Sequence, residues 1–370
     1  MSPERHHLAS LDVFRGLAVA GMIVVNNPGN WGAVYRPLMH APWNGWTFAD
    51  TIFPCFIFIT GVTMPFALAR RAAHAARTRV LVRIGTRVAA LVSMGLVLNA
   101  ADAWIHGHVL RVPGVLQRIG LAYAIAAPIV LLTEVRVWAF AATGLLAVHT
   151  LLLLMPFAGY PAGTLTPAHN LPGLVDAAVF GAHMFTPTFD PEGLVGTLSA
   201  AATMLCGAVA GAWCRAGSES MRRVGLLAAA GALALIVALM WATQLPLNKT
   251  MWTGSYALAS AGFATLMFSA CVTVVDIAGW RSWMQPFAWL GVNPLAIYFL
   301  SELTRYLLDL AWVGLSASIG TKDALFWRYL VPVIGDAGGP RSSLIFALAV
   351  TAAWTAVAGT MYRRGVRIRV

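Results

Sequence analysis

The sequence predicts an all-α, polytopic membrane protein with about ten transmembrane helices in one bundle. Of its 370 residues, 59% are hydrophobic and only 11% are charged, and the mean hydropathy is +0.73. Soluble domains average about 25% charged residues. The apolar residues also form runs of about 20, which is the length that crosses a bilayer as a helix. Together these observations exclude a soluble globular protein.

The apolar runs define ten expected spans. They cover residues 11–28, 47–69, 84–101, 115–133, 137–156, 194–214, 224–242, 254–277, 286–308 and 342–362. No polar stretch between them is long enough to fold separately, so residues 1–370 are interpreted as a single transmembrane domain. The first residues contain no short apolar run that ends in a small-residue cleavage site. We therefore expect the first run to be a retained helix and not a removable signal peptide.

The basic residues predict the orientation. The net charge is +11, but the arginines flank apolar runs, which favours a role in orientation over nucleic-acid binding. With ten spans, 17 of the 25 basic residues fall on the side of the termini and 8 on the other side. The positive-inside rule then places both termini in the cytoplasm, at an inner (cytoplasmic) membrane. The connections at 102–117, 157–193 and 246–252, and the segment around His40, would face outward.

The cysteines and glycines indicate helix packing. The four cysteines lie in or near apolar runs without metal-type spacing, so we expect neither a disulfide framework nor a metal site. Gly207 and Gly211 form a small-xxx-small pair, which packs helices closely either within one chain or in a homodimer.

Asn26 to Gly61 is the stretch most typical of a functional site. His40 lies between two apolar runs, where ionisable groups are costly and usually functional. Its imidazole titrates near neutral pH and can act as a general base. It can also form an acyl-imidazole, or simply hydrogen-bond a loop. Asn26 ends the first run and can either cap it or polarise a carbonyl group. Asp50 can cap the second helix or orient His40.

Other polar residues on the expected outer side are candidate substrate contacts. Trp43 and Trp46 can form a sugar-stacking platform, with Asn44 between them as a further substrate contact, although tryptophan also anchors helices at membrane interfaces. Asp190 and Glu192 can bind an ammonium group or start a helix. Asn248 and Lys249 follow the seventh span, where Lys249 can contact substrate or sit at the interface. Glu302 and Arg305 are three apart on one helix face, and we expect them to pair.

Six ordered blocks resemble the transmembrane acyltransferases of the heparan-alpha-glucosaminide N-acetyltransferase type, most closely their bacterial, NagX-like members. The blocks are SLDVFRG, the dipeptide VN at residues 25–26, HAPWNGWTFADTIFPCFIFITG, GVLQRIG, FDPEGLVGT and PLNKTMWTGSY. The resemblance implies an enzyme that moves the acetyl group of cytosolic acetyl-CoA to the amine of glucosamine or a glucosaminide at the outer face. It places the family's active histidine on His40 and its active-site asparagine on Asn26.

The donor would be a co-substrate, and no metal is expected. We predict acetyl-CoA contacts at Arg15, Arg71, Gln117, Arg118 and Asn293; arginines near the cytoplasmic ends of helices suit phosphates or anionic lipid equally. The alternative function is a transporter for amino sugars such as N-acetylglucosamine, against which the absence of an internal repeat in the sequence counts. Membrane lipids and a second copy of the chain are the other expected partners.

Overall fold

The protein is a bundle of apolar helices. The computed structural model describes residues 9–72, 76–217, 220–310 and 320–368. In the described part of the chain, nine helices are long and apolar enough to cross a membrane. The long elements are α1 (Ala9–Asn26), α2 (Phe48–Ala72), α3 (Arg77–His106), α4 (Val115–Leu132), α5 (Val135–Leu154), α7 (Leu194–Arg215), α8 (Met221–Trp241), α9 (Gly254–Cys271) and α14 (Pro340–Arg363). The prediction of a polytopic all-α membrane protein is confirmed.

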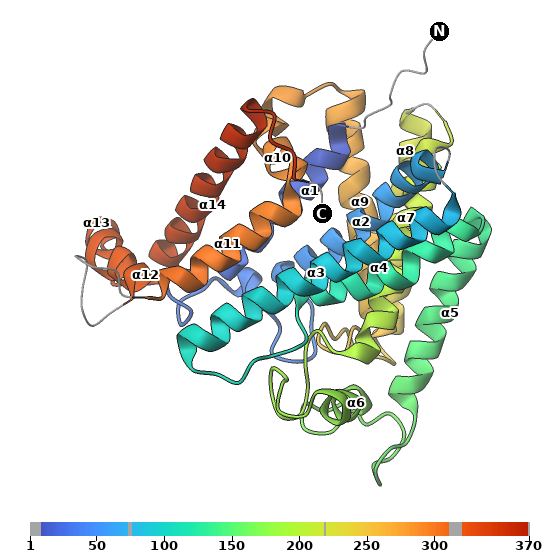
Figure 1. Ribbon diagram of the computed structural model, residues 1–370, viewed down its shortest axis with the longest axis horizontal. Coiled ribbons are helices and arrows are strands. Elements are labelled where there is room, and N and C mark those ends of the chain that lie inside the picture. The colour runs from blue at the N-terminus through green and yellow to red at the C-terminus, as the bar shows by residue number, and fades with distance from the viewer. Residues whose placement is uncertain (1–8, 73–75, 218–219, 311–319, 369–370) are drawn as a thin grey trace.

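The remaining elements are short and connect or extend the long helices. They are η1 (Arg36–Leu38), α6 (Leu171–Phe180), η2 (Val272–Ile277), α10 (Arg281–Val292), α11 (Pro294–Leu308), α12 (Thr321–Asp323), η3 (Ala324–Leu330) and α13 (Val331–Ile334). In Figure 1, α3 and α4 run next to each other across the bundle, α5 borders one side, and α12, α13 and α14 lie at the other. The small helix α6 lies at the bottom of that view, where Asp176 of α6 bonds the first amide of α7.

One predicted span is wrong in detail. Residues 286–308 do not form a continuous helix, because α10 ends at Val292 and α11 begins at Pro294. Proline has no N–H to donate and disfavours helical geometry in the residue before it, so the chain bends at Asn293. The Asn293 amide bonds the C-terminal tail there, donating to Val366 O and accepting from Ile368 N. Hydropathy is continuous across this break and does not reveal it.

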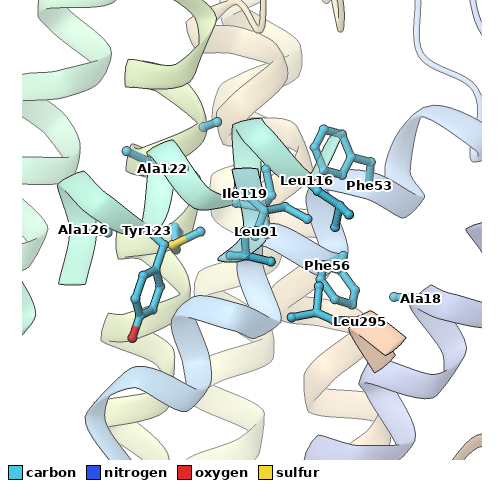
Figure 2. Packing of buried hydrophobic residues seen from close by; sticks show 14 of the residues in the cluster. Ala18, Phe53, Phe56, Leu91, Leu116, Ile119, Ala122, Tyr123, Ala126 and Leu295 are labelled. Atoms are coloured by element: carbon cyan, nitrogen blue, oxygen red, sulfur yellow. The ribbon is translucent and has the colours of Figure 1, made fainter. Parts of the chain in front are cut away.

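Two helices in the centre pack against each other through glycines. A Cβ at Gly61 of α2 would overlap the backbone of Met204 in α7, and one at Gly207 or Gly211 of α7 would overlap α2. The small-xxx-small pair therefore works within the chain, as one of the two expected alternatives. Larger side chains form the core around this seam. Figure 2 shows Leu116, Ile119 and Tyr123 of α4 with Leu91 of α3 and Phe53 and Phe56 of α2, all buried in one cluster.

Four connections meet at one end of the bundle, which we call the site end: residues 27–47, 107–114, 155–193 and 242–253. Backbone hydrogen bonds join Gly45 to Leu247 and Val112 to His183. The indole of Trp43 donates to Leu165 O at 2.9 Å. These contacts confirm that the connections predicted to share one side do so. At the opposite end, the first amides of α1 bond the carboxylate of Asp276 in η2.

Candidate active site

His40 lies in the connection between α1 and α2 and is held by a buried carboxylate. Its Nδ1 is 2.8 Å from Asp50 Oδ1, in the first turn of α2. The Asp50 side chain is 1% exposed and that of His40 is 45% exposed. An ionised carboxylate only accepts hydrogen bonds, so Nδ1 carries a proton, and in the neutral imidazole Nε2 is the nitrogen with the lone pair. The pair thus presents a basic nitrogen at an accessible position.

Asp50 is fixed by the start of its own helix. Thr47 precedes α2, and its amide and hydroxyl both donate to Asp50 Oδ2, at 3.2 and 3.0 Å. The amide of Ala41 donates to the same oxygen at 3.0 Å. The bond from the Thr47 amide is one half of a helix capping box, in which the carboxylate three residues into the helix accepts from the amide of the N-cap residue. Asp50 therefore fills both roles considered for it, capping the helix and orienting His40.

Lys249 approaches the same histidine from the connection between α8 and α9. Its Nζ is 3.1 Å from His40 Nδ1, 3.4 Å from His40 Nε2 and 3.5 Å from Asp50 Oδ1. Burial lowers the pKa of Lys249, although the carboxylates of Asp50 and Glu192 act in the opposite direction. His40, Asp50 and Lys249 form a compact group, which we call the histidine cluster.

The other outer-side candidates mostly support the loops. Buried Asn248 donates to Asn44 Oδ1 at 3.0 Å and accepts from the amide of Met251 at 2.8 Å. Trp43 is half-buried, and its ring makes an edge contact with Phe189 at 5.1 Å. Asn44 itself is exposed. Asn248 and Asn44 hold the connection that carries Lys249 against the one that carries His40, and Trp43 holds the latter against residues 155–193.

Asp190 and Glu192 form a closed ion-pair group with Arg111. Arg111 Nε donates to Asp190 Oδ2 at 2.9 Å, and its Nη2 contacts Asp190 Oδ1 and Glu192. Burial by itself lowers the pKa of Arg111, but the two carboxylates outweigh it and leave that pKa above its ordinary range. Both carboxylates predicted to bind substrate thus already have a cationic partner. Arg111 lies in a short connection and was not singled out in the sequence.

Asn26 belongs to a second polar group, beside a cavity of about 200 Å³. Its Nδ2 donates to Glu302 Oε1 of α11 at 2.7 Å, and Arg305 donates to Glu302 Oε2 at 3.1 Å. The predicted pairing of Glu302 with Arg305 is confirmed. The cavity opens between α1, α3, α4 and α11. Its lining includes Asn26, Trp31, Asn99, Arg111, Gln117, Tyr298, Glu302, Arg305 and Tyr306.

The structure does not join Asn26 to His40 directly. His40 does not line the cavity, and the hydrogen bonds of the two side chains go to different partners. The two groups are linked through the outer connections. Glu192 pairs with Arg111, which lines the cavity, and it also acts electrostatically on Lys249 in the histidine cluster. Glu302 is the site residue whose importance sequence reasoning underestimated, although a carboxylate within an apolar run is itself a signal.

The residues predicted to contact acetyl-CoA are dispersed. Arg15 pairs with Asp12 at 3.0 Å. Gln117 lines the cavity and donates to Val112 O, and Arg118 is 1% exposed, bonded to Gly193 O. Asn293 holds the C-terminal tail, as described above. The Arg71 side chain lies outside the described residues. No hydrogen bond or ion pair joins any two of the residues Arg15, Gln117, Arg118 and Asn293. Among the described residues, no group of three or more potential metal ligands occurs.

The fold and this site define a multi-pass membrane protein with two features at one end of its bundle: a histidine that is hydrogen-bonded to a buried carboxylate, and a polar cavity. The family model for the catalytic domain of heparan-alpha-glucosaminide N-acetyltransferase matches residues 7–240, and the chain belongs to that family. The human enzyme of that name is 26% identical over 96% of this chain and 59% of its own length. The mouse enzyme is 23% identical over 97% of this chain and 60% of its own length. The chain thus spans about three fifths of these curated relatives.

Proposed function

We propose that the protein is a membrane-embedded acetyltransferase that moves the acetyl group of acetyl-CoA to the amine of glucosamine or a glucosaminide. The donor would come from the cytosol, and transfer would occur at the site end, facing outward from an inner membrane. The family membership supports acyl transfer to an amino sugar. The 2.8 Å contact between His40 Nδ1 and buried Asp50 is the observation that supports the catalytic roles proposed for these two residues.

In this mechanism His40 is the general base. Asp50 holds the imidazole in the tautomer whose Nε2 accepts a proton, in the way that carboxylates orient catalytic histidines. The acceptor amine gives a proton to Nε2 as its nitrogen attacks the thioester carbon. A C–N bond forms, the C–S bond breaks, and the proton leaves on the CoA thiol. General base catalysis of this kind contributes about 10²–10⁴-fold.

Asn26 is proposed to polarise the thioester carbonyl from the cavity. Its Nδ2 gives one hydrogen to Glu302, and the second remains for a ligand. Because the carboxylate can only accept, Glu302 fixes which end of the Asn26 amide faces it. The acceptor would lie between the cavity and the histidine cluster, close to Arg111 and Glu192. Asn44, Trp43 and Asn248 would shape its edge, whereas the donor contacts at Arg15, Arg71, Gln117, Arg118 and Asn293 stay predictions. A homodimer is a further proposal.

The test is thiol release from acetyl-CoA by purified protein with glucosamine as acceptor, comparing wild type with His40→Ala. We expect acceptor-dependent release that falls by about 10²–10⁴-fold in the variant. His169→Ala is the matched control, because His169 is an exposed histidine of the same end that stacks on Tyr160. Its activity should remain near that of wild type.

Two results would contradict the proposal. Equal release by wild type and His40→Ala would remove His40 from the mechanism. Absence of release with any amino sugar, together with accumulation of labelled sugar in proteoliposomes, would instead support the transporter for amino sugars.

A further inference from the structure

We propose that Lys249 is a site of self-acetylation, at which the lysine amine takes the acetyl group when donor is present and acceptor is absent. This inference rests on the proposed function, because it needs the acetyl group to reach His40. It adds a second, internal acceptor to the same site. The product would be an Nε-acetyl-lysine next to the base.

The position of the amine carries the inference. Lys249 Nζ lies 3.1 and 3.4 Å from the two ring nitrogens of His40. A base that deprotonates an incoming amine at Nε2 is therefore equally close to an amine that is already part of the chain. Amines held next to their catalytic group react as if at very high concentration.

Hydrogen bonds hold the connection that carries Lys249 in place. The fold itself therefore positions the Lys249 amine beside His40. The preceding residue, Asn248, is fully buried and bonds Asn44, Met251 and the hydroxyl of Thr253. The Thr253 hydroxyl also donates to Pro246 O at 2.8 Å. The connection is thereby closed on itself, and the bond from Asn248 to Asn44 ties it to the segment that contains His40.

The amine is also reachable and reactive. The Lys249 side chain is 20% exposed, which leaves room for attack from the side of the site. Burial lowers the pKa of Lys249 and so increases the fraction of neutral amine, despite the opposing carboxylates. A neutral lysine amine is the form that attacks acyl carbon.

The step balances with acetyl-CoA as the co-reactant. The neutral Nζ attacks the thioester carbon, a C–N bond forms, and the C–S bond breaks. One proton passes from Nζ to His40 Nε2 and then to the CoA thiolate. The products are acetylated Lys249 and free CoA thiol, with His40 returned to its starting form.

Acetylation of Lys249 would inactivate the site. It removes the positive charge that lies 3.5 Å from Asp50 Oδ1 and adds an amide beside the His40 ring. Acetyl-CoA without acceptor should therefore inactivate the protein with time, and glucosamine should protect it by consuming the acetyl group first.

The chain contains an internal control, because it has two lysines, Lys249 and Lys322. Lys322 is also buried, and burial also lowers its pKa. Its ammonium lies 5.9 Å from the ring centre of Trp31 and has no His40 beside it. A comparison of the two lysines separates position beside the base from mere reactivity of a buried amine.

The experiment incubates the purified full chain with acetyl-CoA alone, with acetyl-CoA plus glucosamine, and with buffer, then maps acetyl groups by peptide mass spectrometry. Wild type, His40→Ala and Lys249→Arg are compared. We expect acetylation of Lys249 to exceed that of Lys322 by at least about tenfold in wild type, from its held position. Glucosamine and His40→Ala should each reduce it. Lys249→Arg should lose both the mass shift and the time-dependent inactivation.

Equal acetylation of both lysines, or none at Lys249 in protein that releases thiol with glucosamine, would overturn the inference while leaving the proposed function intact. Acetylation of Lys249 that depends on His40, in protein that acetylates no amino sugar, would support the inference and redirect the search for the acceptor. Neither thiol release nor acetylation would overturn both.

Discussion

The carboxylate of Glu302 determines how the side-chain amide of Asn26 is oriented at the end of α1. An amide side chain can face a partner with either its oxygen or its nitrogen. Glu302 removes that freedom for Asn26, and Arg305 fixes Glu302 in turn through a 3.1 Å contact. The Arg305 guanidinium lies 4.1 Å from the ring centre of Tyr306, which supports it from the other side. Asn26 is therefore oriented by a chain of contacts that begins on another helix.

This arrangement predicts strong coupling between Asn26 and Glu302. Asn26→Ala should lower kcat by about 10²–10³-fold if the amide polarises the thioester, as loss of one oxyanion donor does. Glu302→Gln should lower kcat less, since a neutral amide tolerates both orientations of Asn26, and KM for acetyl-CoA should change little. If Glu302 acts through Asn26, the double variant should be no slower than Asn26→Ala alone.

The control for this cycle is Glu134→Gln, because Glu134 is an exposed glutamate that precedes α5, away from the cavity. It should change neither kcat nor its coupling to Asn26→Ala. Additive losses for Asn26→Ala and Glu302→Gln would show that the glutamate acts independently of the asparagine.

Individual polar residues can be singled out from the sequence, but the contacts that bring them together cannot be predicted from it. His40, Asn26 and Asp50 stand out because polar groups between apolar runs are unusual. The contact between Lys249 and His40 joins residues 209 positions apart, and that between Asn26 and Glu302 joins residues 276 apart. No local pattern encodes such distances. Arg111 was missed for the same reason, since its meaning depends on two carboxylates far along the chain.

Among the helices, the junction between α6 and α7 contains a buried carboxylate, whose ionised form costs free energy because it is removed from water. Asp176 of α6 is fully buried, and its Oδ1 accepts from the amide of Leu194 at the start of α7. No donor in the described part of the chain reaches its Oδ2. Burial raises the pKa of Asp176 from 3.8 to about 6, assisted by the carboxylate of Asp190 and opposed by the Leu194 amide and Arg118.

The sign of this shift predicts how stability depends on pH. The pKa of Asp176 is higher in the folded state than in the unfolded state. Its contribution to the free energy of unfolding is therefore fully present at low pH and is lost as pH rises through about 6. The loss amounts to at most roughly 3 kcal/mol, from about 1.4 kcal/mol per pKa unit. Asp176→Asn cannot ionise. Its melting temperature in detergent, relative to wild type, should therefore be higher above this pKa than below it.

Asp102→Asn serves as the control, because Asp102 is a partly exposed carboxylate of the same end, paired with His106. Parallel melting temperatures for wild type and Asp176→Asn across the pH range would show that Asp176 is not protonated in the folded protein.

The helices themselves were predictable to within a few residues, with two informative exceptions. The span expected at 84–101 is the longer helix α3, whose first turns carry arginines and therefore escape a search for apolar runs. The span expected at 286–308 is broken at Asn293, where a local proline effect is invisible to averaged hydropathy. Apolar length thus identifies which segments are helical, whereas helix ends and breaks depend on individual side chains.

For the whole molecule, the site end unites four connections that lie far apart in the sequence. The proposed orientation places this end outside the cytosol and the end near Asp276 inside. The basic residues that flank the helices predict this orientation, and labelling on the intact membrane tests it.

A pair of single-cysteine variants provides that test, in a chain whose four native cysteines are replaced by serine. Ala168→Cys lies in the exposed part of the connection before α6, and Arg364→Cys follows α14. A membrane-impermeant thiol reagent should label Ala168→Cys in intact cells and Arg364→Cys only after permeabilisation. The reverse pattern would invert the topology and place the site end in the cytosol.

The glycine seam between α2 and α7 also has a consequence for how a substrate reaches the cavity. Helices whose backbones touch through Gly61, Gly207 and Gly211 cannot slide or separate without losing that close fit. The cavity wall formed by α11 contains no glycine, and the 2.7 Å hydrogen bond from Asn26 to Glu302 joins it to α1. We therefore expect α2 and α7 to stay in place when substrate enters, and any widening of the cavity between α1 and α11 to break the Asn26–Glu302 hydrogen bond.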